Sequence, residues 1–347
     1  MALYLFSGFF ELTPKTNLAI FSGLFFLFSF VERIVLSRIF VSGALGVAIV
    51  GSSPLLTDAV DHIKKNPHLG YRILRTFSEF GEKEFKTVAE DIRARKIQMV
   101  VLRSASFNDT GPLSQLYHLL PLEVEIVHFR NFYETVFEKV ALDELSEAWF
   151  LENIATRKPF FDGAKRILDV IASALLLIIL FPVFLLIAIL SKFTSRGPIL
   201  YPQTRAGKNS STFVLYKFRS MRTDHDGPLW TEQNDTRITT FGRILRATHL
   251  DELPQLINIL KGDISFAGPR PERVELAEQF KTFPHYEMRH VVKPGLTGWA
   301  QINYRPSASL EEAREKLCYD LYYIKNRSLF LDLLILIRTI RHFLLSH

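Results

Sequence analysis

The sequence predicts a membrane-associated α/β protein, and three observations support this fold class. Short apolar runs alternate with amphipathic stretches over residues 41 to 130, which is typical of βαβ units. A run of 21 uncharged residues, Val170 to Leu190, would form a helix of about 31 Å, which matches the hydrocarbon core of a bilayer. The 347 residues suffice for two or three domains.

The composition excludes several classes of protein. Hydrophobic residues make up 48% of the chain and charged residues 22%, so wholesale disorder is excluded. The one cysteine, Cys318, allows no intrachain disulfide and no cysteine-built metal site. The net charge of +6 is compatible with nucleic acid, an anionic membrane surface or phosphate-bearing substrates, and it does not choose among them.

Residues 1 to 40 are expected to form an N-terminal membrane segment. Two apolar stretches, Ala2 to Phe10 and Leu18 to Val31, are separated by a turn-like segment. The second reaches the roughly 20 residues that cross a bilayer only if its helix continues further. We predict one membrane helix there. Arg33 and Arg38 would place the following residues in the cytoplasm by the positive-inside rule.

Residues 41 to 130 are predicted to form a Rossmann-like domain, followed by a connector over residues 131 to 158. The turn from Gly51 to Pro54 lacks two of the three glycines that let backbone approach a dinucleotide, so a structural or regulatory role is favoured over nucleotide binding. A helix is predicted over Lys83 to Arg95. The four predicted strands are Gly46 to Val50, Tyr71 to Phe77, Met99 to Leu102 and Val124 to Val127.

The run from Val170 to Leu190 has two interpretations. Its length favours a transmembrane helix. However, Pro182 removes a helix hydrogen bond in the middle of the run, and basic residues flank both ends. If both ends prefer the cytoplasm, the segment must enter and leave by one face, so we favour a re-entrant helix over residues 166–192. The apolar segment Leu329 to Leu345 fits either an interfacial helix or core packing.

Asp251 and Glu252 form the first candidate site. They follow Arg246 and precede an apolar segment that has Pro254 in its opening turn. A helix-capping aspartate with a first-turn glutamate would look the same. Alternatively, one carboxylate can attack an activated phosphorus while its neighbour holds Mg²⁺ against phosphate oxygens.

Three further motifs carry candidate binding residues. Arg270 lies between two prolines, and its planar guanidinium on stiff backbone suits bidentate contact with phosphate, although a solvated loop arginine fits equally. Lys217 and Arg219 share one face of a predicted strand, which exposed edge charges would also explain. In the turn-rich segment that begins at Lys293, Trp299 either lines a pocket or anchors a loop.

The sequence lacks the motifs of several other enzyme classes. The chain has no GxSxG, HExxH or P-loop pattern, and no tyrosine is followed by lysine four positions later, as a short-chain sugar-nucleotide dehydrogenase would require. A nucleic-acid partner would rest on net charge alone, and we expect none.

Five motifs, taken in order, closely resemble the bacterial sugar transferases, which are monotopic polyprenyl-phosphate phosphoglycosyl transferases. The resemblance covers the chain from about Phe160 to its end. The N-terminal half resembles the extension of the large members of that family, which carry a Rossmann-like domain and usually about four membrane helices, whereas this sequence shows one or at most two. The motifs are YKFRSM at 216, FGRILRATHLDELPQL at 241, DISFAGPRPE at 263, KPGLTGWAQIN at 293 and YDLYYIKNRS at 319.

This resemblance implies transfer of a sugar-1-phosphate from a UDP-sugar to undecaprenyl phosphate. The products would be undecaprenyl-diphosphate-sugar and UMP, at the start of exopolysaccharide, capsule or O-antigen synthesis. Asp251 would be the nucleophile of a covalent aspartyl-phosphosugar intermediate, and Glu252 would be its partner at Mg²⁺. Pro182 would break the re-entrant helix. Substrate contacts would come from Lys217, Arg219, Arg246, Arg270, Lys293, Trp299 and Gln301.

The resemblance also implies an architecture. The phosphoglycosyl transferase domain would span residues 159–347, in the bacterial inner membrane with its catalytic part facing the cytoplasm, in contact with membrane lipid; a homo-oligomer is compatible with the sequence. Two alternatives remain at this point. An intact Asp-Glu pair weighs against a membrane-attached regulatory or scaffold subunit, and the run from Val170 to Leu190 weighs against a cytosolic sugar-nucleotide-modifying enzyme.

Overall fold

The computed structural model describes residues 20–31, 43–79, 81–103, 117–154, 158–194, 197–221, 237–304 and 309–345. They belong to two compact units, Met1–Val136 and Phe137–His347, each of which is described by itself. In the first unit, residues Ile20–Val31 form an apolar helix whose large side chains are mostly exposed. The rest of the predicted N-terminal membrane helix lies outside the described residues.

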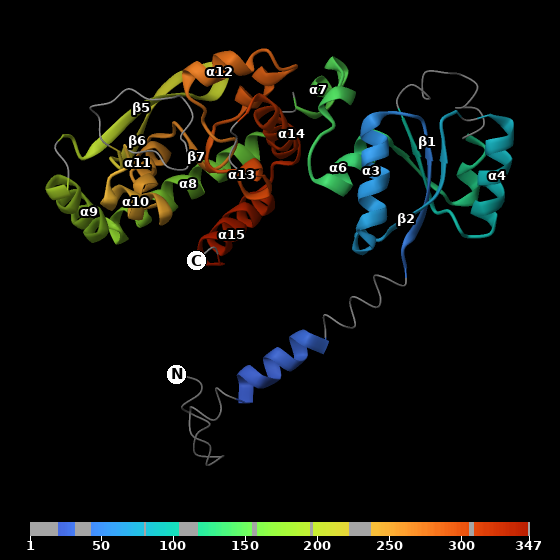
Figure 1. Cartoon of the computed structure of the whole chain (residues 1–347), viewed down its shortest axis with the longest axis horizontal. Coiled ribbons are helices and arrows are strands. Elements are labelled where there is room, and N and C mark those ends of the chain that lie inside the picture. The colour runs from blue at the N-terminus through green and yellow to red at the C-terminus, as the bar shows by residue number, and fades with distance from the viewer. Residues whose placement is uncertain are drawn as a thin grey trace. The chain divides into compact units, whose positions relative to one another are not determined.

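The rest of the first unit is built on a four-stranded parallel sheet in the order β2-β1-β3-β4 (Figure 1). Strand β3 is buried at all its positions and β1 at all but its first, which explains their continuous apolar sequence. All four predicted strands and the predicted helix are confirmed, with shifts of one or two residues at their ends. The elements are β1 (Leu45–Val50), α3 (Pro54–Lys65), η1 (Pro67–Leu69), β2 (Tyr71–Phe77), α4 (Glu82–Arg93), β3 (Met99–Leu102), η3 (Leu120–Leu122), β4 (Glu125–His128) and α6 (Phe129–Phe137).

The turn after β1 is closed by an arginine. Gly51 has a φ of 123°, and a Cβ there would lie 2.7 Å from the Cβ of Arg103. The Arg103 guanidinium donates a hydrogen bond of 2.7 Å to the carbonyl of Ser52, and Ser53 caps α3 by accepting from the Leu56 amide. The prediction that this turn binds no dinucleotide stays a prediction.

The second unit combines helices with two small sheets. Strands β5 and β6 form an antiparallel hairpin, and β7 pairs in parallel with β8. The elements are η4 (Leu142–Glu144), α7 (Glu147–Asn153), α8 (Pro159–Ile179), α9 (Phe181–Thr194), β5 (Leu200–Ala206), η5 (Lys208–Ser210), β6 (Thr212–Phe218), α10 (Thr240–Ala247), η6 (Leu250–Glu252), α11 (Gln255–Lys261), β7 (Ser265–Ala267), α12 (Val274–Phe280), η7 (Tyr286–Val291), β8 (Gly295–Thr297), α13 (Trp299–Asn303), α14 (Leu310–Asn326) and α15 (Leu329–Leu345).

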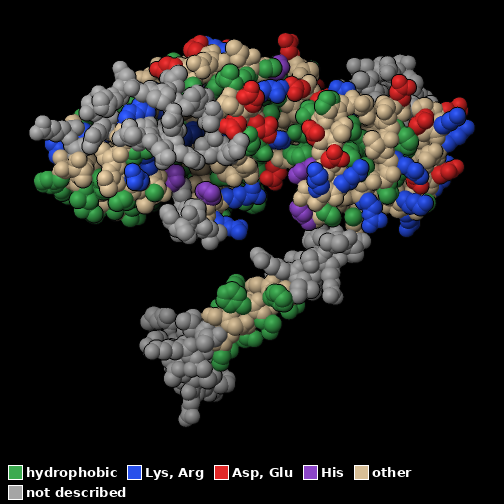
Figure 2. Space-filling model, viewed as in Figure 1, with side chains coloured by type: hydrophobic (Ala, Val, Ile, Leu, Met, Phe, Trp, Pro, Cys, Tyr) green, Lys and Arg blue, Asp and Glu red, His purple; other side chains and the backbone are tan. Residues whose placement is uncertain are grey.

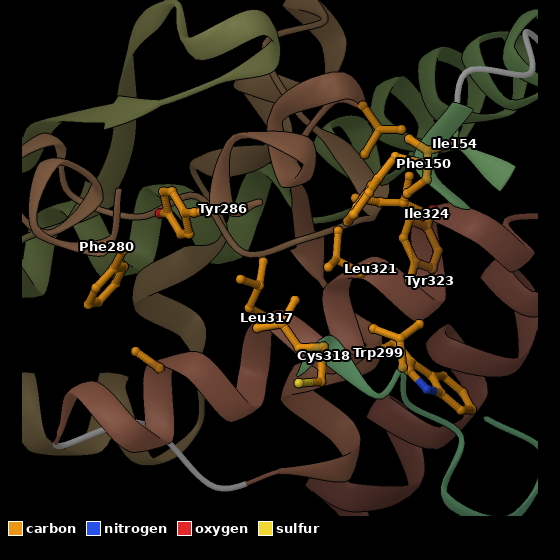
Figure 3. Packing of buried hydrophobic residues seen from close by; sticks show 14 of the residues in the cluster. Phe150, Ile154, Phe280, Tyr286, Trp299, Leu317, Cys318, Leu321, Tyr323 and Ile324 are labelled. Atoms are coloured by element: carbon orange, nitrogen blue, oxygen red, sulfur yellow. The ribbon is translucent and has the colours of Figure 1, made fainter. Parts of the chain in front are cut away.

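Helix α14 runs through the main core of this unit, and the segment before α8 packs against that core. Figure 3 shows Phe150 and Ile154 meeting Ile324 of α14, and all three belong to one buried cluster. The indole of Trp299 donates a hydrogen bond of 2.8 Å to the carbonyl of Glu138. The units therefore divide after Val136, and the second half of the expected connector is part of a core. The buried side chains in this part of the connector are too irregularly spaced to give a periodic pattern in the sequence.

The long apolar run folds as two helices with a sharp bend between them. Helices α8 and α9 meet at a break that bends the axis by 60°. Pro182 lies in the first turn of α9, where its missing N–H needs no partner. Within the described residues, only this bent pair has the length and apolar composition of a membrane span, and no single helix does. The predicted break is confirmed as a bend, while a re-entrant path through lipid stays a prediction.

We predict that Trp149→Ala lowers the free energy of unfolding by about 3 to 5 kcal/mol, because it empties a buried site. Trp149 is 3% exposed in the core next to Phe150. Leu151 on the same helix is 72% exposed, so Leu151→Ala is the matched control and should change stability little. Denaturant unfolding of the purified chain measures both. Equal effects would mean that residues 137–154 do not belong to the core.

Candidate active site

Asp251 and Glu252 lie on a one-turn segment between α10 and α11. His249 adopts a left-handed conformation with a φ of 54°, which turns the chain so that η6 can follow. Pro254 is the residue that precedes α11, and no side chain caps that helix. The simple interpretation of the pair as a helix cap is therefore wrong, and the buried Asp251 carboxylate has no capping role.

Glu252 is held by two cations from separate parts of the chain. Its Oε1 accepts a hydrogen bond of 2.7 Å from the Lys217 ammonium on β6 and one of 2.9 Å from the Arg270 guanidinium. Burial by itself would raise the pKa of Glu252, but Arg270 and Lys217 hold that pKa well below its usual range. Glu252 is therefore ionised at every physiological pH and fixes both cations beside it.

The environment of Asp251 differs from that of Glu252, although the two residues are adjacent in the sequence. Burial raises the pKa of Asp251 to about 6, with Lys217 opposing the rise and Glu252 adding to it. No described residue donates a hydrogen bond to its carboxylate or lies within ion-pair distance of it. At neutral pH, Asp251 is thus mostly a carboxylate that lies near several positive charges and has no ion-pair partner among the described residues.

The loop that carries Arg270 is fixed through its carbonyl groups. The Pro269 carbonyl accepts from the Gly295 amide at 2.9 Å, and the Arg270 carbonyl accepts from the Arg289 guanidinium at 3.0 Å. Arg289 is itself buried, with an ion pair of 2.8 Å to Asp320 on α14. With the two prolines restricting φ, this network leaves the Arg270 backbone little freedom.

Arg205 is a site residue that the sequence analysis missed. Its guanidinium donates to the Pro271 carbonyl at 3.1 Å and to the Gln203 side chain at 2.6 Å. Burial and repulsion from Arg270 lower its pKa to about 10, and within the described residues no carboxylate lies at ion-pair distance. No local sequence pattern distinguishes Arg205 from an exposed strand arginine, so only the fold shows that it lies near the site.

The structure brings together some of the predicted site residues and separates others. Asp251, Glu252, Lys217 and Arg270 form one cluster, and the charge of Arg246 reaches Asp251 from α10. Four others lie elsewhere: Arg219 donates to the Ser191 carbonyl at the end of α9, Lys293 lies beside Arg166, Trp299 is buried in the core, and Gln301 donates to the Leu296 carbonyl.

Asp251 and Glu252 are also the candidate Mg²⁺ ligands. Among the described residues, no three His, Cys, Asp or Glu side chains gather into a metal-binding group. A complete protein cage is therefore lacking in that part of the chain. Two adjacent carboxylates still fit Mg²⁺, because this ion commonly takes one or two carboxylates and completes its shell with water and substrate phosphates.

Several known proteins resemble this chain. The profile of a family described as bacterial sugar transferase matches residues 160–346. The chain is 38% identical over 221 residues to the UDP-N-acetylgalactosamine-undecaprenyl-phosphate N-acetylgalactosaminephosphotransferase of Aeromonas hydrophila, covering 63% of this chain and 52% of that protein. It is 32% identical over 317 residues to the UDP-glucose:undecaprenyl-phosphate glucose-1-phosphate transferase of Klebsiella pneumoniae, covering 85% and 66%.

A shorter relative is matched over almost its whole length. The exopolysaccharide production protein PSS of Rhizobium leguminosarum bv. phaseoli is 42% identical over 185 residues, which are 51% of this chain and 92% of that protein. By contrast, the chain spans only about half to two thirds of the length of the Aeromonas and Klebsiella relatives.

We predict that Asp251→Asn stabilises the protein at pH 7.5 but not near pH 4. An acid whose pKa is raised on folding favours the folded state at low pH, and that contribution is lost as pH rises through the folded pKa. A rise of about two pKa units corresponds to about 3 kcal/mol, which the amide should recover at neutral pH. Thermal unfolding across this pH range measures the difference.

The neighbouring substitution provides the contrast. Glu252→Gln leaves Lys217 and Arg270 without their shared carboxylate, so it should destabilise the protein at neutral pH. If both variants shift the melting temperature in the same direction at pH 7.5, the two carboxylates do not have the different environments described here.

Proposed function

The chain belongs to the bacterial sugar transferase family, and from this premise we propose that it transfers a sugar-1-phosphate from a UDP-sugar to undecaprenyl phosphate. The products are undecaprenyl-diphosphate-sugar and UMP, and the reaction initiates assembly of an exopolysaccharide, capsule or O-antigen. The names of the Aeromonas and Klebsiella relatives, each an undecaprenyl-phosphate sugar phosphotransferase, support the substrates.

The observation that carries the proposal is the uncommitted Asp251 carboxylate beside a fixed group of cations. Two diphosphate-bearing species must pass through the site, and Lys217, Arg270 and Arg205 offer the positive charge that such oxyanions need. A scaffold subunit would have no use for a buried carboxylate that has no ion-pair partner among the described residues, so that alternative is disfavoured.

The reaction would proceed in two displacements at one phosphorus. Asp251 attacks the phosphorus that bears the sugar, forming an acyl phosphate, while the bond to the UMP oxygen breaks and its electron pair leaves with UMP. An oxygen of undecaprenyl phosphate then attacks the same phosphorus and releases the Asp251 carboxylate. Asp251 and Glu252 are the residues that would hold Mg²⁺, and the ion would supply positive charge to the donor diphosphate.

The membrane would hold the site next to its lipid substrate. Helix α15 buries Leu331, Asp332 and Ile335 against the core and leaves an apolar face exposed. Figure 2 shows hydrophobic side chains gathered where Figure 1 places α9. We take the exposed apolar side chains of α8, α9 and α15 to enter the cytoplasmic leaflet of the inner membrane. They include Ile171, Leu175, Ile178, Phe181, Leu185, Ile189, Phe330, Leu333, Ile337 and Ile340. The first unit, which precedes them in the sequence, would be a Rossmann-like domain.

Asp251→Asn should lower turnover by about three orders of magnitude or more, since it keeps the shape and removes the nucleophile. UMP release from a UDP-sugar with undecaprenyl phosphate and Mg²⁺ measures turnover. Initial-rate plots should be parallel, and intact mass after incubation with donor alone should show the sugar-phosphate adduct only in the wild type. The rate should rise with pH through about 6 as Asp251 loses its proton.

Asp143→Asn is the control, because Asp143 is an exposed carboxylate that pairs with Arg314 and should leave turnover unchanged. Intersecting rate plots together with the absence of an adduct would mean a direct transfer, in which Asp251 is a base or a metal ligand rather than the nucleophile.

The topology predicts that both ends of the bent pair are reached from the cytoplasm. Phe160 and Phe193 are 87% and 85% exposed, so Phe160→Cys and Phe193→Cys are suitable probes. Cys318 can remain, because burial raises its pKa to about 12 and keeps its thiol unreactive. A membrane-impermeant maleimide should label both probes in inside-out vesicles and neither in intact spheroplasts. Labelling of either probe from the periplasmic side would mean a spanning helix.

A further inference from the structure

Arg205 is fixed beside the loop between β7 and α12, and both of its acceptors in the protein are neutral. Its two terminal nitrogens donate to the Pro271 carbonyl at 3.1 Å and to the Gln203 side chain at 2.6 Å. The backbone of β5 adds a contact to the same loop, because the Ala206 amide donates to the Glu272 carbonyl at 3.0 Å. Strand β5 therefore holds the Arg205 guanidinium at a set position relative to that loop.

The positive charge of Arg205 has no carboxylate at ion-pair distance in the described part of the chain. Arg270 and Arg273 repel this charge, while Glu272 and Glu252 attract it from further away. Burial and the repulsion from Arg270 lower the pKa of Arg205 to about 10, so its guanidinium is still charged at neutral pH. Arg205 and Arg270 are thus two like charges held near each other, and an oxyanion bound by both would remove their repulsion.

The Arg205 guanidinium also keeps N–H groups that a ligand could use. Of the five N–H groups of an arginine, two donate to Pro271 and Gln203, and the Nε–H is enclosed, out of reach of a ligand. One N–H on each terminal nitrogen has no acceptor among the described residues. Arg205 is half-buried, not enclosed, and two N–H groups in one plane suit bidentate binding of a phosphate.

The order of the cations around Asp251 matches the order of the phosphates in a sugar-nucleotide donor. Lys217, Arg246 and Arg270 are the cations that act most strongly on the Asp251 carboxylate, so Arg205 is the outer cation of this group. Attack at the sugar-bearing phosphorus places the leaving oxygen on the side opposite the attacking carboxylate. The nucleotide phosphate must therefore lie further from Asp251 than the phosphorus under attack.

We propose, on the basis of the function proposed above, that Arg205 binds the donor phosphate that leaves with UMP, while Lys217 and Arg270 bind the phosphate that carries the sugar. As the bond from the sugar-bearing phosphorus to the UMP oxygen breaks, its electron pair adds negative charge to the UMP phosphate. A guanidinium fixed beside that phosphate lowers the barrier. Arg205 thus acts on the leaving group, whereas Asp251 acts on the phosphorus.

Isothermal titration calorimetry of the full chain in neutral detergent with Mg²⁺, using uridine, UMP and UDP, tests this inference. Arg205→Gln should raise the dissociation constants of UMP and UDP by the same factor, about tenfold or more, because a charge-assisted contact to their shared phosphate is lost. Uridine has no phosphate, so its affinity should not change. Arg205→Lys keeps the charge without the planar pair of donors and should lose less affinity. Arg273→Gln is the matched control, since it removes a neighbouring guanidinium that lies 3.8 Å from Glu275, and it should leave all three affinities nearly unchanged.

Several outcomes would overturn the role of Arg205. Weaker binding of UDP alone would place Arg205 at the sugar-bearing phosphate, and an equal loss with uridine would mean that Arg205 only supports the fold. Unchanged affinities, or the same loss in Arg273→Gln, would show that Arg205 does not contact the nucleotide phosphate. A wild-type chain that binds neither UMP nor UDP would contradict the proposed function as well. If UMP binds through Arg205 but none is released from a UDP-sugar, only the proposed function fails.

Discussion

The Glu252 carboxylate joins three segments that are distant in the sequence: its own turn, strand β6 through Lys217, and the proline-flanked loop through Arg270. Desolvating one acid and two bases is costly, and such a group adds little net stability compared with apolar packing. Its effect is on position and charge. Because Glu252 takes up both cations, the adjacent Asp251 has no ion-pair partner among the described residues, and burial together with the surrounding charges raises its pKa to about 6. The two ion pairs of Glu252 thus leave the neighbouring carboxylate available for chemistry.

This arrangement depends on supports that carry no reactive group. Asn258 of α11 donates to the Val214 carbonyl at 2.7 Å and accepts from the Tyr216 amide at 3.1 Å, so β6 cannot move relative to the helix that follows Asp251. On the other side, the Arg289–Asp320 pair connects the Arg270 loop to α14 and the main core. Rigid second contacts of this kind would hold the proposed catalytic group within the small tolerance that phosphoryl transfer requires.

The sequence predicted the parts of the fold that have a local signal. The strands of the first unit are short apolar runs bounded by turns, and Pro182 marks the bend in the long apolar run. Asp251, Glu252, Lys217 and Arg270 were predicted as candidate site residues and do come together. Tertiary contacts decided the rest. The half-buried Arg205 and the buried Arg219 have the same local sequence signature as an exposed arginine. For Trp299, the sequence does not separate a pocket wall from an anchor, whereas the hydrogen bond to the Glu138 carbonyl identifies an anchor.

The two ends of the bent helix pair are both fixed to the domain by arginine side chains. Arg166 near the start of α8 donates to the carbonyls of Ile259 and Leu260, which end α11, and Arg219 after β6 donates to the Ser191 carbonyl on α9. An apolar pair held at both ends cannot slide relative to η6, so the depth to which it inserts would set the height of Asp251 above the lipid surface. A soluble sugar nucleotide and a lipid phosphate could then meet at one carboxylate, because the bent pair that we propose to enter the membrane is fixed by Arg166 and Arg219 to segments that flank the site.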